Sequence, residues 1–355
     1  MSGPGAPGKA GGGIRRAFRW DIDKTYLATD FESLRRMLRV PFESASDKVA
    51  IAGASVLIGE LRRVAHARGE SSTVSFITAS PRQIAGPILA KLALDGVEHD
   101  GVVFKEQMHH LVRGRFAVLR EQVGFKLAQL LAGAVAAGPD THELLFGDDW
   151  ESDPFVYSLY ADILAGRLDQ ADTLELLAMC GVHRHYGDRI LASLGRLPPV
   201  DARSRVGSVL ILRQRMVPAS RLAVFGPRLV WFDDYLECSL DLFLLGLLDR
   251  EAVLAVARAT GRPADTVSAI FDAVCSRGQG LRERLSPVRA ALLAEGLMDE
   301  VAAGSGLKRL RAALARRRGS FGGRAAGPGA PGSEAGPLPD YQALVVDWSK
   351  RRRKE

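Results

Sequence analysis

Up to about residue 250, short apolar segments of strand character alternate with segments of helical periodicity. Each strand-type segment is rich in β-branched or aromatic residues, and apolar residues then recur every three or four positions. This alternation predicts a mainly parallel sheet with helices on both faces. The predicted strands are residues 14–20, 73–81, 102–104, 143–146, 208–212 and 228–232, and the predicted helices between them include residues 31–40, 54–67, 84–94 and 122–137.

Polar side chains gather where three of these strands end. Asp21 and Asp23 follow the first strand, acids follow the strand at residues 143–146, and hydroxyls end the strand at residues 73–81. In a parallel sheet, ligands bind in the crevice outside the carboxyl ends of the strands. Two acids in that crevice can divide the work of phosphoryl transfer, because one attacks phosphorus while the other moves a proton. A solvated loop is the alternative for an Asp-x-Asp pair taken alone.

Four segments, in this order, resemble the motifs of the haloacid-dehalogenase-like phosphotransferases. They are residues 21–25 (Asp-Ile-Asp-Lys-Thr), Thr78, Lys126 and residues 147–153. More narrowly, Thr-x-Ser-Pro at residues 78–81 and Gly-Asp-x-x-x-x-Asp-Pro at residues 147–154 are similar to the family of the fungal actin-patch phosphatidate phosphatase and its bacterial relatives. The resemblance covers about residues 14–250. It implies a doubly wound α/β fold with a helical insertion around residues 158–205.

The resemblance also implies catalytic roles. Asp21 would be the nucleophile that forms an aspartyl-phosphate, and Asp23 would protonate the leaving oxygen and then take a proton from water. Thr78 and Ser80 would bind the substrate's phosphoryl group. Lys126 would offset the negative charge that this group shares with Asp21.

A Mg²⁺ ion is the cofactor that the resemblance implies. Asp21, the backbone carbonyl of Asp23, Asp148 and Asp153 would be its ligands. So many carboxylates in one crevice repel each other unless a cation is present, and Mg²⁺ prefers hard oxygen ligands.

Some assignments stay open at the level of the sequence. Lys105 competes with Lys126 for the lysine role, and Asp149 competes with Asp153 as metal ligand. Asp233 and Asp234 also follow a strand, and we interpret them as a turn or a helix start. Thr78 and Ser80 could be turn and cap residues, with Pro81 opening a helix. Cys-x-x-His-x-His at residues 180–185 is a weak zinc pattern, because a second ligand cluster is missing.

Three positions depart from the narrower family. That family has a small residue where Trp20 stands, a second acid where Lys24 stands and a histidine where Phe125 stands. None of the three is a core catalytic position of the wider superfamily. They therefore bear on the substrate more than on the chemistry.

The composition predicts a cytoplasmic protein. Residues 1–13 form a Gly/Pro/Ala-rich leader without the apolar core of a secretory signal, and no apolar run reaches the 18 to 20 residues, approximately, of a membrane span. The three cysteines are far apart, which favours reduced thiols over a disulfide framework.

Beyond the phosphatase domain, residues 251–318 predict a helical appendage, with helices at residues 251–259, 264–275, 281–295 and 301–318. Residues 319–340 are a Gly/Pro-rich linker, and residues 341–355 are an apolar segment followed by a basic run. That tail could dock on the domain or touch an anionic membrane surface. Too few aromatic residues accompany the basic runs to predict specific nucleic-acid binding.

The sequence therefore predicts a Mg²⁺-dependent phosphatase that acts on a phosphomonoester. Phosphatidate at a membrane surface is the substrate that the narrower resemblance favours. A phosphatase of a soluble metabolite and an inactive module that binds phosphorylated ligands are the alternatives. The intact pair Asp21 and Asp23 speaks against the inactive module, because binding alone needs no second acid.

Overall fold

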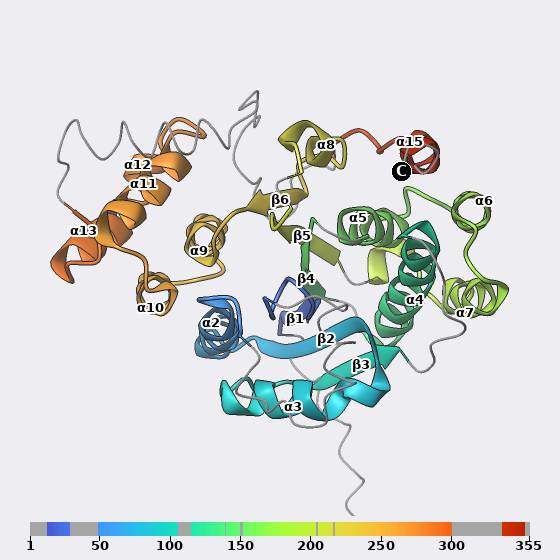
Figure 1. Cartoon of the computed structure of the whole chain (residues 1–355), viewed down its shortest axis with the longest axis horizontal. Helices are drawn as coiled ribbons and strands as arrows, with labels where there is room; N and C mark the ends of the chain where they lie inside the picture. Colours follow the sequence, from blue (N-terminus) through green and yellow to red (C-terminus); the bar gives the residue numbers. More distant parts are fainter. Residues whose placement is uncertain are drawn as a thin grey trace, which may run out of the picture.

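One sheet of six strands forms the centre of the computed structural model of this chain (Figure 1). The structure describes residues 13–28, 49–105, 115–138, 140–149, 152–203, 205–215, 217–299 and 336–351. Within them the strands are β1 (Arg15–Trp20), β2 (Ser71–Pro81), β3 (Gly101–Lys105), β4 (Thr141–Asp148), β5 (Arg205–Leu212) and β6 (Leu229–Phe232). Their order is β3-β2-β1-β4-β5-β6, and every neighbouring pair is parallel.

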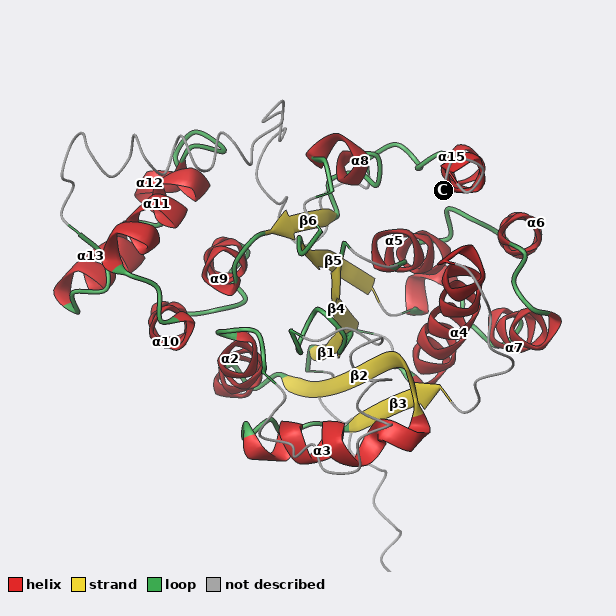
Figure 2. Ribbon diagram, viewed as in Figure 1, coloured by secondary structure: helices red, strands yellow, loops and turns green. Residues whose placement is uncertain are grey.

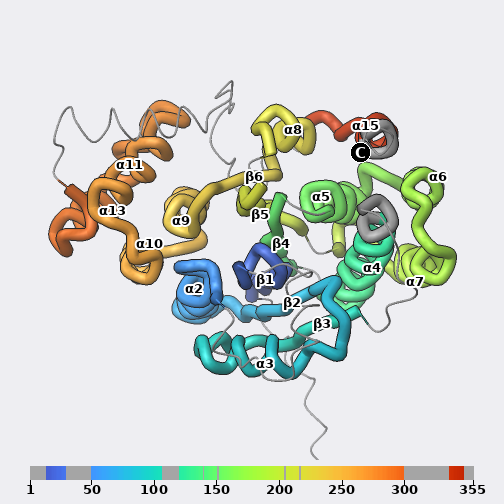
Figure 3. The backbone as a smooth tube through the Cα atoms, in the orientation of Figure 1, coloured from blue at the N-terminus to red at the C-terminus, as the bar shows by residue number. Residues whose placement is uncertain are grey.

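Helices pack on both faces of the sheet, because successive strand residues point to opposite faces and both sets are apolar. In β4, Leu144 and Phe146 belong to one buried cluster, while Leu145 belongs to the other. The first cluster includes residues of α2 (Ala54–Ala67), α3 (Ala85–Leu94), α9 (Tyr235–Leu244) and α10 (Arg250–Thr260), and the second includes residues of α4 (Arg115–Ala136), α5 (Asp153–Leu164), α6 (Gln170–Cys180) and α7 (Arg184–Leu194). Figures 2 and 3 show α2 and α9 across the sheet from α4 and α5. The predicted doubly wound α/β fold is confirmed.

The strand order reverses between β1 and β4, which defines the switch point of the sheet. β2 and β3 extend the sheet on one side of β1, and the chain then returns to place β4 on the other side. In open α/β sheets, this is where the crevice outside the carboxyl ends binds ligands. Trp20 and Phe146 are partners in the β1–β4 register and stack with ring centroids 3.8 Å apart, which holds the two strand ends together.

β1 contains arginines, which are unusual in a buried strand. Arg19 donates to the buried carboxylate of Glu143 on β4 at 2.5 Å, and Tyr160 of α5 donates to the same carboxylate. A buried cation is tolerated when it is paired and hydrogen-bonded. A Cβ at Gly133 of α4 would lie 2.6 Å from Arg19 Nη1, so the glycine provides room for the guanidinium.

Two helix predictions were wrong, one in where the helix begins and one in its continuity. α4 begins at Arg115 rather than at residue 122, because the intervening residues are helix formers without proline or glycine. Lys126 therefore lies inside this helix rather than near its start. The single helix predicted at residues 281–295 is split into α12 (Leu281–Arg284) and α13 (Ser286–Ala294). Pro287 lies in the first turn of α13, where its missing N–H is tolerated.

In the described residues between β4 and β5, the chain forms α5, α6, α7 and the short 3-10 segment η3 (Val200–Ala202). The helical stretch begins at Asp153, five residues before the predicted insertion at residues 158–205. A further short helix, α8 (Ala219–Ala223), precedes β6. Outside the described residues lie residues 1–12 of the predicted leader, the predicted helices at residues 31–40 and 301–318, and most of the linker.

The helices after residue 250 do not all form a separate layer. Ala252 and Val256 of α10 are buried in the cluster that covers the sheet, in contact with α2. α11 (Ala264–Cys275), α12 and α13 pack with α9 and α10 around a third apolar cluster. α9 and α10 thus connect this helical group to the sheet.

The C-terminal helix α15 (Tyr341–Arg351) returns to the domain and lies beside α6 (Figure 1). Tyr341 and Val345 are buried in the second cluster, and the Tyr341 ring meets Phe155 edge-on. The Tyr341 hydroxyl donates to Asp162 at 2.6 Å, and Arg167 and Arg228 pair with the same carboxylate. The structure therefore shows the docked form of the tail.

Among the described helices, none has both the length and the apolar character that a membrane crossing requires. Cys180, Cys238 and Cys275 are buried and free, as the sequence predicted. Burial raises the pKa of the Cys180 thiol to about 12, so this thiol stays protonated and unreactive at neutral pH.

Replacing Tyr341 with alanine tests whether α15 is docked in solution. Loss of a buried aromatic ring and its hydrogen bond should lower the free energy of unfolding by about 3 kcal/mol. Gln342→Ala, which removes only an exposed hydrogen bond to Glu175 of α6 at 3.2 Å, should change it by about 0.5 kcal/mol or less. Urea denaturation measures both, and equal stabilities would contradict the docking.

Candidate active site

The candidate site lies at the switch point, where β1 and β4 end side by side. Asp21 directly follows β1, and Asp148 is the last residue of β4. The Asp21 N–H donates to the Phe146 carbonyl at 2.8 Å, which continues the ladder one residue beyond β1. This bond fixes the backbone of Asp21 against β4 and brings its side chain next to Asp148.

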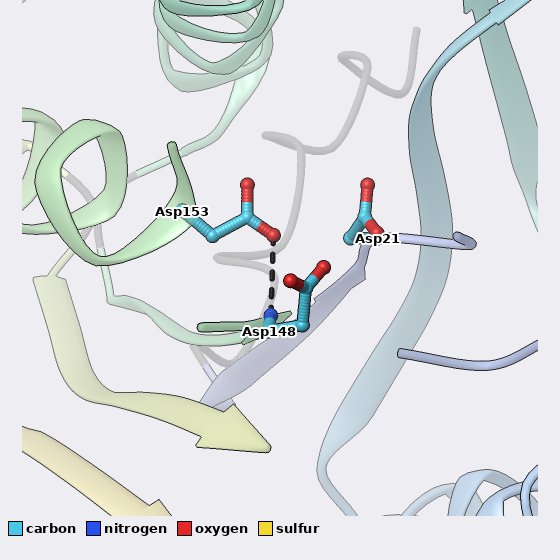
Figure 4. Close-up of side chains that lie close together, drawn as sticks. All are labelled: Asp21, Asp148 and Asp153. Carbon is cyan, nitrogen blue, oxygen red and sulfur yellow. Dashed lines mark hydrogen bonds between the residues drawn. The ribbon is translucent and has the colours of Figure 1, made fainter. Parts of the chain in front are cut away.

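Asp153, the first residue of α5, completes a group of three carboxylates (Figure 4). One oxygen from each of Asp21, Asp148 and Asp153 lies within 4.8 Å of the other two, and none of the residues is more than 1% exposed. The Asp148 N–H donates to Asp153 Oδ2 at 3.3 Å. Three hard oxygen donors at this separation could hold a metal ion.

Gly147 leaves room for Asp153. A Cβ at this position would lie 2.4 Å from Asp153 Oδ2 and 2.6 Å from its Cβ, closer than real contacts allow. The glycine of the Gly-Asp motif is therefore explained by the approach of a side chain from α5. Gly147 does not have a positive φ, so the glycine is not required by a left-handed turn.

Lys126 of α4 lies between two of the carboxylates. Its ammonium donates to Asp21 Oδ1 at 2.8 Å and to Asp153 Oδ1 at 2.5 Å, and the side chain is fully buried. Lys105, the competing lysine, pairs instead with Glu121 of α4 at 2.6 Å. Among the described contacts of this group, Lys126 supplies one positive charge against three buried carboxylates, and a divalent cation would compensate the carboxylates further.

The second acid, Asp23, is held by the end of β2. Thr78 donates to Asp23 Oδ2 at 2.9 Å and Ser80 donates to the same oxygen at 2.7 Å. All three side chains are buried. The capping role considered for Ser80 was wrong, because β2 continues to Pro81 and the serine hydroxyl bonds to Asp23 instead. Asp23 does not contribute its carboxylate to the group of three acids.

Asp149 turns away from the group of three acids. Its carboxylate accepts backbone N–H bonds from Gln214, Arg215 and Val217 at 2.7–2.8 Å, in the loop after β5. Successive backbone N–H groups of this kind form an anion-binding concavity. Burial raises the pKa of Asp149, while these N–H bonds act in the opposite direction. The geometry thus places Asp153, and not Asp149, with Asp21 and Asp148.

The remaining candidates have structural contacts. Asp233 forms a two-pronged ion pair with Arg213, and Asp234 caps α9 through the Leu236 N–H. His183 pairs with Glu121 at 2.8 Å. In the described part of the chain, the residues of the Cys-x-x-His-x-His pattern form no ligand group, since the group found there is the three aspartates.

Three polar residues near the site were not assigned roles from the sequence. Thr25 donates to Asp21 Oδ2 at 3.3 Å, and the Tyr235 hydroxyl donates to the Thr25 carbonyl at 2.7 Å. Tyr157 lies one helical turn after Asp153, and burial together with the Asp153 carboxylate raises its pKa. The spacing of Asp153 and Tyr157 was a usable signal, because residues four apart share a helix face. Tyr235 gave no such signal, because its contact joins distant segments.

Comparisons of the chain with protein-family models, with curated protein sequences and with solved structures found no match. The fold and the site together define an α/β protein of the doubly wound class with a buried carboxylate cluster at its switch point. This cluster could hold a metal ion.

Thermal unfolding with and without Mg²⁺ tests the cation site without any assumption about turnover. A ligand that binds only the folded state at 100 times its Kd stabilises it by about 2.7 kcal/mol, so Mg²⁺ should raise the Tm of the wild type by a few degrees. Asp148→Asn should abolish this rise. The control Asp188→Asn, at an exposed position of α7, should retain it. The same rise in all three proteins would place the ion elsewhere.

Gly147→Ala should weaken Mn²⁺ binding by about ten-fold or more, because the new methyl group displaces the Asp153 carboxylate. Gly207→Ala is the matched control on the neighbouring strand β5, where a Cβ would meet its nearest atoms at 3.8 Å. Electron paramagnetic resonance of free Mn²⁺ measures both affinities. An unchanged affinity in Gly147→Ala would remove Asp153 from the ligand set.

Proposed function

We propose that the protein is a Mg²⁺-dependent phosphatase of the haloacid-dehalogenase type, which hydrolyses a phosphomonoester through an aspartyl-phosphate. The observation that carries the proposal is the meeting of Asp21, Asp148, Asp153 and Lys126 in one buried cluster, with the second acid Asp23 on the loop that follows β1. These residues come from segments up to 132 positions apart in the chain. The same segments carry the resemblance to the four ordered motifs.

In the first half of the proposed reaction, an Asp21 carboxylate oxygen attacks phosphorus. The bond between phosphorus and the leaving oxygen breaks, and Asp23 in its acid form gives that oxygen a proton. In the second half, water attacks the phosphorus of the aspartyl-phosphate and Asp23 takes up the proton of the water. Inorganic phosphate leaves, and Asp21 is a carboxylate again.

The neighbouring residues support this division of labour. Lys126 contacts Asp21 at 2.8 Å, so its charge also offsets the phosphoryl group that Asp21 accepts. Thr78 and Ser80 fix the aim of Asp23. Each hydroxyl has a single proton to donate, so to bind the transferred phosphoryl group, as the resemblance implies, it would turn from Asp23 to a phosphoryl oxygen. Mg²⁺ held by Asp21, Asp148 and Asp153 would neutralise negative charge on the phosphoryl oxygens.

Asp23 distinguishes the phosphatase from an inactive module that only binds phosphorylated ligands. A binding module needs cations and hydrogen-bond donors, but it does not need a second acid to move a proton. In this structure the second acid is held by two hydroxyl groups from β2. That arrangement favours an enzyme.

Phosphatidate is the substrate that we propose first. The narrower resemblance points to it, and the basic run at residues 350–354 begins at the C-terminal end of the docked helix α15 and would attract an anionic membrane surface. Lys24 stands where the narrower family has an acid, so a soluble phosphomonoester is the second candidate. We place the protein in the cytoplasm, with the membrane contact as part of the phosphatidate proposal.

Phosphate release from phosphatidate in mixed micelles and from a panel of soluble phosphomonoesters, each with and without Mg²⁺, tests the proposal. The wild type should release phosphate only when Mg²⁺ is present. Asp21→Asn should lower kcat by on the order of a thousand-fold or more, since it removes the nucleophile while the fold remains. The control Asp188→Asn should keep wild-type turnover.

The outcomes separate the candidates. Release from soluble esters alone would replace phosphatidate with a soluble substrate. Binding of phosphorylated compounds without release would favour the inactive module. Full turnover in Asp21→Asn would remove Asp21 from the nucleophile role.

A further inference from the structure

Tyr235, the first residue of α9, contacts the loop after β1 that carries Asp21 and Asp23. Its hydroxyl donates to the Thr25 carbonyl at 2.7 Å, and both residues are fully buried. Tyr235 lies outside the four segments that resemble the phosphotransferase motifs. Burial raises its pKa well above the usual value, and the carboxylates of Asp21 and Asp148 add to this effect. The phenol therefore stays neutral and remains a hydrogen-bond donor.

Packing from several elements fixes the Tyr235 ring. Its centroid lies 6.0 Å from that of Trp20 at the end of β1 and 5.3 Å from that of Phe232 at the end of β6. At the start of α2, a Cβ on Gly53 would lie 3.2 Å from the Tyr235 Cβ and 3.1 Å from Thr260 of α10. Gly53 also has a φ of +88°, which glycine adopts without strain. The hydroxyl is thus held by a rigid ring.

The loop that Tyr235 contacts needs such support. Lys24 has a φ of +61°, a backbone conformation that residues other than glycine rarely adopt. The Tyr26 and Leu27 N–H groups both donate to the Ile22 carbonyl, so the loop is a tight turn. At its apex, Thr25 directs its hydroxyl to Asp21 Oδ2 at 3.3 Å, a long hydrogen bond. A small rotation of the Thr25 backbone would break this bond.

We propose that Tyr235 is a positioning residue for Asp21 and acts through Thr25. Its bond to the Thr25 carbonyl sets the backbone from which the Thr25 hydroxyl reaches the Asp21 carboxylate. The two bonds connect α9 to one oxygen of Asp21, while Lys126 contacts the other oxygen. The inference rests on the proposed function only for the role of Asp21 in catalysis.

Mn²⁺ affinity is the readout, because Asp21 belongs to the carboxylate group and the measurement needs no turnover. Removing a residue that orients a metal ligand lowers metal affinity by about 10- to 100-fold, and for this indirect contact we expect about ten-fold in Tyr235→Phe. Thr25→Val should give a similar loss, and Thr25→Ser, which keeps the hydroxyl, should bind Mn²⁺ within about two-fold of the wild type. Tyr341→Phe is the matched control, a buried tyrosine that donates to Asp162, and it should bind like the wild type.

A double-mutant cycle tests the route through Thr25. If Tyr235 acts by aiming the Thr25 hydroxyl, Tyr235→Phe in the Thr25→Val background should cause little further loss. Fully additive losses would overturn the route, and wild-type affinity in Tyr235→Phe would overturn the positioning role. If Tyr235→Phe does not fold by circular dichroism, Thr25→Val and Thr25→Ser decide the matter. Equal Mn²⁺ affinity in these two variants would overturn the proposal.

The result can be told apart from a failure of the proposed function. A protein that binds Mn²⁺ but releases no phosphate would contradict the phosphatase, while the affinities of the variants would still decide the role of Tyr235. A wild type that binds no Mn²⁺ would contradict both. In an active enzyme, Tyr235→Phe should lower kcat with little change in KM, because it disturbs the nucleophile more than substrate binding.

Discussion

The ammonium of Lys126, between the carboxylates of Asp21 and Asp153, is the interaction on which the site depends. Carboxylates buried this close raise each other's energy unless a positive charge compensates them. Lys126 supplies one positive charge from the middle of α4, and a divalent cation would compensate the carboxylates further. The divalent cation that would stabilise the buried acids is therefore also the ion that phosphoryl transfer needs.

The fold brings these charges together through its topology. The reversal of strand order places the ends of β1 and β4 side by side, and the stacked rings of Trp20 and Phe146 hold them in register. β4 ends at Asp148, and α5 begins at Asp153, whose side chain lies against Gly147, where only a hydrogen atom fits. Support also comes from distant segments, because the loop after β5 captures Asp149 and α9 contacts the loop after β1.

The sequence predicted the sheet because parallel strands and their covering helices leave periodic patterns that local rules can read. It placed Asp21 and Asp148 in one crevice because both follow strands. It left Asp149 and Asp153 undecided, since the aim of Asp149 depends on backbone N–H groups more than 60 residues away and that of Asp153 on Lys126. The same limit explains the error at Ser80, where a local capping rule gave way to a bond with Asp23, and the absence of Tyr235 from the predicted site.

The central claim is that Asp21, Asp148 and Asp153 share one divalent cation. A crystal grown with Mn²⁺ and measured for anomalous scattering tests it most directly. The account predicts one anomalous peak with an oxygen of each of the three carboxylates about 2.0–2.6 Å away. Crystals with no peak between these residues at saturating Mn²⁺, or with a peak held by other side chains, would contradict it.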